Sequence, residues 1–156
     1  RDFLLKQFGD RNITVGVYPF AGVALFNEST LEYYQNNLAL MDAGVRHGLF
    51  RDGRTIYTRV RDRVPTTYGV DAQIDDCIVA DGCRLEGKAE HSVFFRQVKL
   101  EEGARVKDCV IMNDCVVGRG AELYCVILDK DVVVRPGVRL IGTPENPIMV
   151  KRGDVV

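Results

Sequence analysis

The chain has 156 residues and a mass of 17.5 kDa, the size of one domain or of one small domain with part of another. Hydrophobic residues make up 46% of it, and no apolar run approaches the roughly 20 residues of a membrane-spanning helix, so we expect no membrane contact. The 21 basic and 22 acidic residues leave a net charge of −1, which argues against a chain-wide field that would attract nucleic acid.

The five cysteines are an odd number, form no C-x-x-C pair and follow no signal peptide. This usage favours reduced thiols and predicts a cytoplasmic protein. The chain begins with Arg1 rather than with Met, and we expect it to be a fragment of a longer protein.

The pattern of apolar and polar residues in the first part of the chain is typical of a mixed α/β segment. Residues 2–8 form a short helical pattern, residues 13–17 alternate apolar and polar side chains as a half-buried strand does, and the apolar run at 23–26 is a candidate to pair with them. Residues 54–62 also alternate, and Pro65 ends this extended stretch. We therefore expect strands on both sides of a helical region.

The helical region itself has clear start signals. Ser29 followed three residues later by Glu32 forms a capping box, which predicts that a helix begins here. Asp42 is the expected cap of a shorter helical turn that ends near Gly48. The apolar residues of the first helix share one face, namely Leu31, Tyr34, Leu38 and Met41.

From Ala72 onward, short apolar pairs recur at intervals of five or six residues. In each pair a small residue is followed two positions on by an aliphatic or aromatic one, as in Cys109 and Ile111. Three intervals add up to 17 residues, as between Ser92 and Cys109. The register is uncertain at two places, around residues 88–91 and at the choice between Cys125 and Val126.

A chain that turns a corner every five or six residues, and repeats after three corners, forms a triangular coil. Successive coils stack as parallel strands ~4.8 Å apart, and single coils are not stable alone. The sequence therefore predicts a mostly β protein with a parallel β-helix over residues 72–156, including a short C-terminal tail. The residues expected inside the helix are Ile74, Val79, Leu85, Leu100, Val106, Ile111, Val117 and Leu123.

The cysteines fall at or beside the small-residue positions of this repeat, where a free thiol is a compact apolar filler. We expect no metal site, because structural zinc ligands normally come in close pairs. We also expect no disulfide between Cys77 and Cys109 or between Cys83 and Cys115, since each pair lies two coils, or ~9.6 Å, apart. Cys109 and Cys125 lie on adjacent coils, and the spacing does not decide whether these two cysteines form a disulfide.

The periodicity resembles that of the hexapeptide-repeat β-helix, and the resemblance implies a left-handed coil. The order of segments is more specific: STLEYYQNNL at 29–38, IYTRVRDRVPT at 56–66, DCIVADGCRLEG at 76–87, SVFFRQV at 92–98 and VILDKDVVV at 126–134. Together they resemble the C-terminal part of bacterial ADP-glucose pyrophosphorylase, or glucose-1-phosphate adenylyltransferase, which makes ADP-glucose for glycogen synthesis.

This resemblance implies a division of the chain into three parts. Residues 1–55 correspond to the end of a nucleotidyltransferase-like α/β domain, whose glycine-rich nucleotide loop lies upstream of these residues in the family. Residues 56–71 are a linking strand and turn, and residues 72–156 are the β-helix. In this family the β-helix serves subunit assembly and regulation rather than chemistry.

The resemblance also points to a lost metal ligand. Catalytic subunits of the family carry a W-R-D-V-G-T-like stretch before the helix, and its Asp helps to hold Mg²⁺. Alignment on Tyr33 and Tyr34 places Phe26 at that Asp, and a phenyl ring cannot ligate a hard cation. This implies a non-catalytic, regulatory type of subunit with no catalytic residue, metal or cofactor in this fragment. A shift of register would instead offer Asn27 or Glu28.

Three arginines are candidates to bind an effector. Arg59, Arg61 and Arg63 alternate along an extended segment and therefore share one face, where guanidinium groups suit a phosphate. The resemblance implies a phosphorylated metabolite bound near the junction of the two domains, where this segment belongs. The alternative is a solvated face balanced by Asp52 and Asp62.

The partner implied by the resemblance is a catalytic ADP-glucose pyrophosphorylase subunit, which would carry the Mg²⁺, or a further copy of the same subunit. A second function stays open, because hexapeptide-repeat acyltransferases usually employ one His as general base. His91 lies inside the repeat and would have that role. A β-helix carbonic anhydrase needs three zinc-binding histidines, and only His47 and His91 are present.

Overall fold

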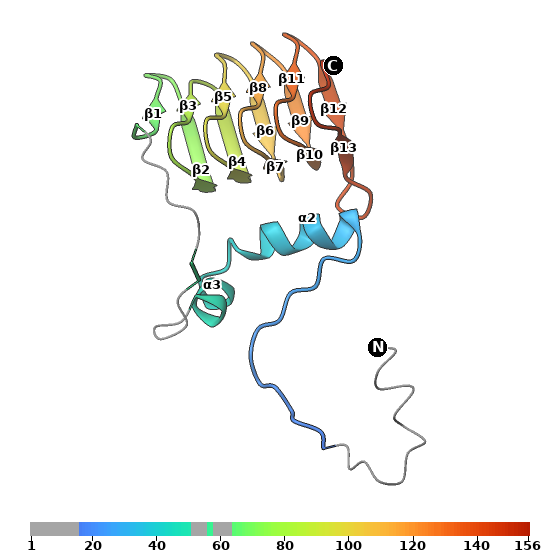
Figure 1. Cartoon of the computed structure of the whole chain (residues 1–156). Coiled ribbons are helices and arrows are strands. Elements are labelled where there is room, and N and C mark those ends of the chain that lie inside the picture. Colours follow the sequence, from blue (N-terminus) through green and yellow to red (C-terminus); the bar gives the residue numbers. More distant parts are fainter. Residues whose placement is uncertain (1–15, 51–55, 58–63) are drawn as a thin grey trace.

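The computed structural model describes residues 16–50, 56–57 and 64–156, and it places two helices beside a parallel β-solenoid (Figure 1). Helix α2 covers Thr30–Ala39, and the short helix α3 covers Ala43–Leu49. Among the described residues, no helix is long and apolar enough to cross a membrane.

Both predicted helix starts are confirmed. The Ser29 hydroxyl caps α2 by accepting a hydrogen bond from the backbone N–H of Glu32 at 3.1 Å. The Glu32 carboxylate reaches one residue farther back than a capping box requires, and accepts from the N–H of Glu28 at 2.7 Å. Asp42 caps α3 by accepting from the N–H of Val45 at 2.8 Å. Local side-chain chemistry is therefore sufficient to begin both helices.

The predicted strand at 23–26 is wrong, because the structure has no strand there. A strand requires a neighbour that completes its hydrogen-bond ladder, and no described segment pairs with these residues. Residues 16–17 and 56–57, the described parts of the two other predicted strands, are not in strands either. The rest of those two segments lies outside the described residues.

The solenoid has three faces. Face A is a parallel sheet made of β1 (Thr67–Tyr68), β3 (Arg84–Leu85), β5 (Lys99–Leu100), β8 (Val116–Val117) and β11 (Val133–Val134). The second sheet folds around a corner into faces B and C. Face B is made of the first halves of β2 (Gln73–Val79) and β4 (Lys88–Phe94), with β6 (Arg105–Lys107), β9 (Glu122–Tyr124) and β12 (Arg139–Ile141). Face C is made of their second halves, with β7 (Val110–Ile111), β10 (Val126–Leu128) and β13 (Ile148–Val150).

The corner between faces B and C is turned by one residue in each coil. Asp76 and His91 interrupt β2 and β4 with φ values of 44°, and Asp108 and Cys125 have φ values of 49° at the equivalent places. This left-handed backbone conformation is uncommon for residues other than Gly, although Asp and His tolerate it better than most. The four residues therefore form a column along one edge of the solenoid.

The 17-residue repeat is confirmed by the strand register, which aligns residues 93, 110 and 127. One coil is shorter, because residues 73 and 88 are aligned and the repeat there is 15 residues long. Only residues 86–87 separate β3 from β4 in this coil. In the next coil, residues 101–104 separate β5 from β6. A Cβ on Gly87 would lie 2.5 Å from the carbonyl oxygen of Ala104, so this tight corner admits only glycine. The irregularity predicted at 88–91 lies just after this corner.

The interior of the solenoid is an aliphatic column, and the predicted interior residues are confirmed. Leu85, Leu100, Val106, Ile111, Val117 and Leu123 are all at most 3% exposed. Ile74 and Val79 pack against this core but are only partly buried, since they belong to the first coil. Each fully buried aliphatic side chain stabilises the fold by roughly 1.5–3 kcal/mol relative to exposure. The predicted fold class, a mostly β solenoid of hexapeptide repeats, is therefore confirmed.

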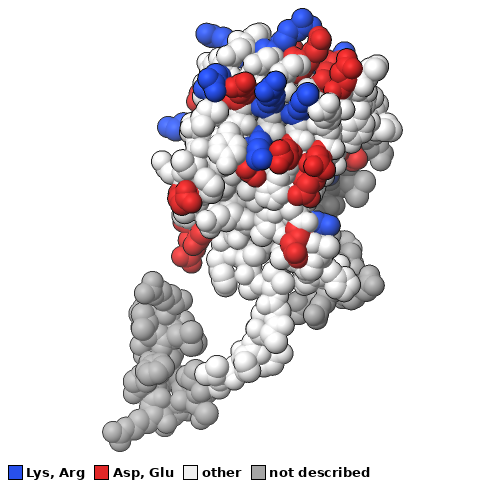
Figure 2. All heavy atoms as spheres, turned by 180° about the vertical axis from the view of Figure 1, so that it is seen from behind, with Lys and Arg blue, Asp and Glu red and all other residues white. Residues whose placement is uncertain are grey.

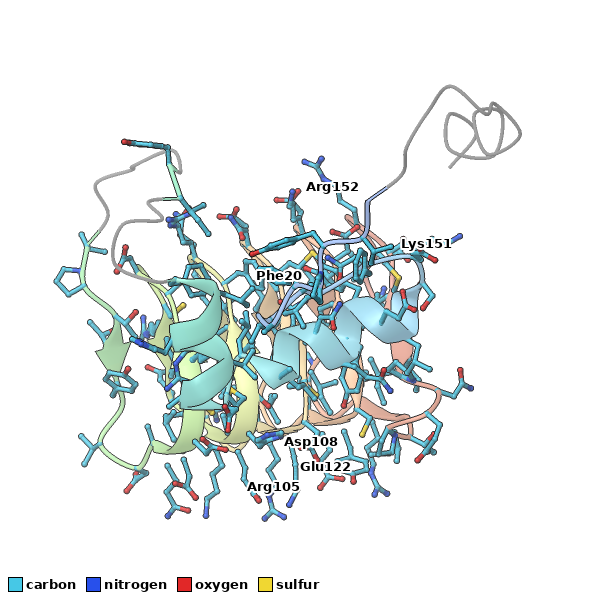
Figure 3. All side chains as sticks on the ribbon, turned by 90° about the horizontal axis from the view of Figure 1, so that it is seen from below. Phe20, Arg105, Asp108, Glu122, Lys151 and Arg152 are labelled. Atoms are coloured by element: carbon cyan, nitrogen blue, oxygen red, sulfur yellow. The ribbon has the colours of Figure 1, made fainter. Side chains whose placement is uncertain are left out.

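Helix α2 lies across face C and contacts β4 and β7 (Figure 3). Its Tyr34 is 2% exposed and forms a second apolar cluster with the outward-facing Val110, Cys125 and Ile127. Leu31, Tyr33 and Leu38 pack around this cluster. The apolar face predicted for the helix is thus the one that contacts the solenoid.

Candidate functional site

The three predicted effector-binding arginines, Arg59, Arg61 and Arg63, lie outside the described residues. Their role therefore stays a prediction.

Phe26 lies in the segment that leads into α2, and its side chain is 70% exposed. The backbone of this segment is tied to the helix, because Asn36 Nδ2 donates to the carbonyl oxygen of Phe26 at 2.5 Å and to Asn27 Oδ1 at 2.9 Å. Sequence reasoning missed this contact, although Asn36 lies inside the predicted helix. The Asn27 amide oxygen, one of the two alternative metal ligands, is thereby already engaged by a protein donor. The phenyl ring of Phe26 offers no oxygen to a cation.

His91 joins three coils at the corner between faces B and C. Its Nδ1 lies 2.7 Å from Asp108 Oδ1 in the following coil, and its Nε2 lies 3.9 Å from Asp76 Oδ2 in the preceding one. A carboxylate beside Nδ1 orients an imidazole as it does in acid–base catalysis. In this chain, however, Nε2 faces a second carboxylate. These contacts therefore link neighbouring coils of the solenoid along the corner. They do not test a general-base role for His91, which stays a prediction.

The same corner anchors α2. The Tyr34 hydroxyl donates to the backbone carbonyl oxygen of Asp108 at 2.7 Å, so the helix is bonded to the residue that also contacts His91. Burial raises the pKa of Tyr34, which keeps its phenol protonated and able to donate. Figure 3 shows α2 lying across the solenoid, with Asp108 at one edge and Arg152 at the other.

Sequence reasoning found the buried face of α2 but missed the surface that receives it. The missed signal is the run of consecutive apolar residues in β7 and β10, where alternation would place a polar residue on the outside. Such runs are typical of strands that are buried on both faces. Val110 and Ile127 are the outward members of these runs, and both are fully buried beneath α2.

All five cysteines are free, as predicted, and four of them are buried. Burial raises the pKa of Cys109 to about 12 and that of Cys115 to about 11, so both stay protonated at neutral pH. The Cys109 thiol donates to the carbonyl oxygen of Lys107 at 3.0 Å. No group of three or more His, Cys, Asp or Glu side chains suited to a metal ion occurs in the part of the chain that the structure describes.

Two of the hollows on the described part of the solenoid adjoin its faces B and C. The first, of about 710 Å³, lies at the first coil; Met41 and Arg46 from the helical region and Ile74, Asp76 and Cys77 from the coil are among its lining residues. The Arg46 guanidinium is held there by the carbonyl oxygens of Leu40 and Met41, each at 2.6 Å. The hollow therefore joins the α2–α3 connection to the solenoid.

The second hollow, of about 580 Å³, lies on face B, and half of its lining residues are charged. Cross-strand ion pairs join Lys107 to Glu90 at 2.8 Å and Arg139 to Glu122 at 2.7 Å. Figure 2 shows basic and acidic side chains intermixed over the side of the solenoid that is turned away in Figure 1. This mixing is typical of a solvated surface.

The fold and these contacts define a hexapeptide-repeat β-solenoid protein with a helix seated on one face. Comparison with known proteins agrees: the model of the family described as "GlmU-like, C-terminal hexapeptide" matches residues 63–146, more than half of the chain. The chain belongs to this family.

Individual relatives are more informative about context. The chain is similar to the glycogen biosynthesis protein GlgD of Bacillus subtilis, with 33% identity over 141 residues, covering 90% of this chain and 41% of the relative. It is 40% identical over 120 residues to the GlgD protein of Geobacillus stearothermophilus, covering 77% of this chain and 35% of the relative. It is also 32% identical over 114 residues to the glucose-1-phosphate adenylyltransferase of Acetivibrio thermocellus, covering 73% of this chain and 26% of the relative.

These similarities confirm the resemblance to bacterial ADP-glucose pyrophosphorylase that the segment order indicated. The chain spans less than half the length of each of these curated relatives.

Proposed function

We propose that this chain is the C-terminal part of a non-catalytic subunit in ADP-glucose synthesis for glycogen, and that it serves assembly with a catalytic subunit and regulation of it. The observation that carries the proposal is Phe26, an exposed phenyl ring at the position where catalytic subunits of the resembling family have the Asp that holds Mg²⁺. Relatives named as glycogen biosynthesis proteins and as glucose-1-phosphate adenylyltransferases support the pathway.

A regulatory role is supported by the way the segment of Phe26 is connected to the solenoid. Asn36 of α2 holds the backbone of residues 26–27, and Tyr34 of the same helix is bonded to Asp108 at the corner of the solenoid. A change in the position of α2 on face C would therefore move the segment that corresponds to the catalytic one. This is the kind of contiguous packing through which coupling between sites is carried.

The effector in this proposal is a phosphorylated metabolite bound by Arg59, Arg61 and Arg63. The test is to mix the full-length subunit with its catalytic partner and to measure the activation of ADP-glucose formation by a panel of sugar phosphates. We expect Arg59→Ala with Arg61→Ala to weaken the activation and to leave co-purification of the two subunits intact. An unchanged activation would indicate that these arginines do not bind the effector and belong to a solvated face.

The matched control is Arg84→Ala with Arg119→Ala, which removes two exposed arginines from the solenoid surface. This double substitution should alter neither activation nor co-purification. Failure of the unmodified subunits to co-purify, or activity of the catalytic subunit that is unaffected by the mixture, would contradict the proposal itself.

An acyltransferase function is a second candidate, favoured by the 2.7 Å contact between His91 Nδ1 and Asp108. It predicts the release of free thiol from acetyl-coenzyme A in the presence of an amino or hydroxyl acceptor, and the loss of that release in His91→Asn. The proposed regulatory role predicts instead that the unmodified chain releases no thiol.

A further inference from the structure

The corner between faces B and C carries one close side-chain contact. Asp76, His91, Asp108 and Cys125 occupy equivalent corner positions, with φ values of 44–49°. Within this described column, the hydrogen-bonded pair of side chains is His91 and Asp108, whose Nδ1 and Oδ1 atoms are 2.7 Å apart. A carboxylate oxygen only accepts a hydrogen bond, so Nδ1 carries the proton that joins the two side chains.

The peptide unit that follows this contact is the one that receives α2. Its carbonyl oxygen, from Asp108, accepts the hydrogen bond of the Tyr34 hydroxyl at 2.7 Å. Its N–H, from Cys109, donates to Ser92 Oγ at 3.0 Å. The peptide bond is planar, so the direction of this carbonyl depends on the backbone conformation of Asp108. That conformation is left-handed, which is uncommon for a residue other than Gly.

We propose that His91 is a positioning residue for helix α2. By holding the side chain of Asp108, it keeps the corner in the left-handed conformation in which the Asp108 carbonyl oxygen meets the Tyr34 hydroxyl. Without this contact, Asp108 relaxes toward a more common backbone conformation and turns the carbonyl away. The seating of α2 on face C therefore depends on a side chain of β4.

The contact lies partly at the surface, whereas the bond that it supports is buried. The side chains of His91 and Asp108 are 38% and 22% exposed, and Tyr34 is 2% exposed. A molecule that binds at the corner therefore reaches His91 without displacing α2. This regulatory meaning rests on the proposed function: a partner that engages His91 would loosen α2 and, through Asn36, the segment of Phe26.

The other neighbour of His91 supplies a matched control. His91 Nε2 lies 3.9 Å from Asp76 Oδ2, too far for a hydrogen bond. Asp76 and His91 have the same φ value of 44°, and Asn tolerates this conformation better than most residues. His91→Asn and Asp76→Asn therefore introduce the same residue, in the same backbone conformation, at neighbouring corners.

The experiment is hydrogen exchange, followed by mass spectrometry, on the 156-residue chain. His91→Asn should accelerate exchange at the backbone amides of α2 by roughly fivefold, the scale of one lost hydrogen bond. Exchange in β8 and β11 should stay unchanged in this variant. Asp76→Asn should leave the exchange of α2 unchanged. Asp108→Gly, which suits the corner and removes the contact from its other side, should also accelerate exchange in α2.

Combination with Tyr34→Phe distinguishes positioning from a general loss of stability. If His91 acts through the Asp108 carbonyl oxygen, His91→Asn with Tyr34→Phe should exchange no faster in α2 than Tyr34→Phe alone, because both changes remove the same bond. Independent effects would instead multiply. Circular dichroism verifies that each variant is folded.

Three results would overturn the inference: unchanged exchange in α2 for His91→Asn, acceleration that is equal in β8 and β11, or effects that multiply with Tyr34→Phe. An effect of Asp76→Asn as large as that of His91→Asn would also overturn it. These measurements involve no catalytic subunit and no effector. Their failure is therefore distinguishable from failure of the proposed function.

Discussion

Faces B and C share two long strands, β2 and β4, yet their outer surfaces differ in polarity. Both faces point small and aliphatic residues inward in the same way. The outward residues of face B are mostly charged, as with Lys88 and Glu90, whereas those of face C beneath α2 are apolar, as with Val110 and Ile127. Face B is solvated, and face C receives α2. The inward residues thus decide the fold, and the outward residues decide what each face contacts.

The largest effect should come from placing a charge beneath the helix. Val110→Asp would bury a carboxylate without a partner, and we expect it to lower the free energy of unfolding by about 3 kcal/mol or more. Arg105→Asp, the same new residue on the exposed surface of face B, should lower it by less than about 1 kcal/mol. Urea unfolding followed by circular dichroism measures both. Equal losses would remove the distinction between the faces.

A smaller effect should follow from removing one hydrogen bond between α2 and the solenoid. Tyr34→Phe keeps the aromatic ring but leaves the carbonyl oxygen of Asp108 without its donor, so we expect a loss of about 1 kcal/mol. Hydrogen exchange should also become faster at the backbone amides of α2 and not in the core of the solenoid. Tyr68→Phe, at an exposed tyrosine, is the control. Unchanged exchange in α2 would show that this bond does not hold the helix.

The buried thiols should make stability fall at alkaline pH. The pKa of Cys109 is raised by burial from 9.0 to about 12 in the folded chain. Between these values the unfolded chain loses the thiol proton and the folded chain keeps it, so the contribution is complete below pH 9 and is lost as the pH rises toward 12. Cys109→Ala should therefore show a shallower decline in unfolding free energy between about pH 8.5 and about pH 10.5 than the unmodified chain. An identical slope would contradict the protonated state assigned to Cys109.

The smallest effect should come from the ion pairs of face B. The side chains of Lys107 and Glu90 are 49% and 54% exposed, so water and salt screen their attraction. A double-mutant cycle with Lys107→Ala and Glu90→Ala should give a weak coupling that disappears at high salt. A strong, salt-independent coupling would mean that face B is covered rather than solvated.

The solenoid was predictable from the sequence because each coil repeats a small residue and an aliphatic residue at corners set by close packing. The helix caps were predictable because they depend only on neighbouring side chains. The short coil was located only approximately, since residues 86–87 contain no apolar side chain to mark the register. The strand predicted at 23–26 was wrong because strand formation depends on a partner that no local pattern specifies.

The candidate site was less predictable for the same reason. The hydroxyl of Tyr34 meets Asp108 across 74 positions of sequence, and His91 meets Asp108 across 17. Neither contact follows from the spacing of apolar residues. The apolar runs in β7 and β10 did contain the information that face C is covered, but a run alone does not identify the helix that covers it.

The proposed function depends above all on a parent subunit that performs no chemistry. The decisive measurement is ADP-glucose formation from ATP and glucose 1-phosphate by the full-length subunit, purified without any partner and supplied with Mg²⁺. We expect no turnover, because Phe26 stands at the metal-binding position. Turnover at rates typical of enzymes, ~1–10³ s⁻¹, would contradict the proposal and would assign the metal to Asn27 or Glu28 instead.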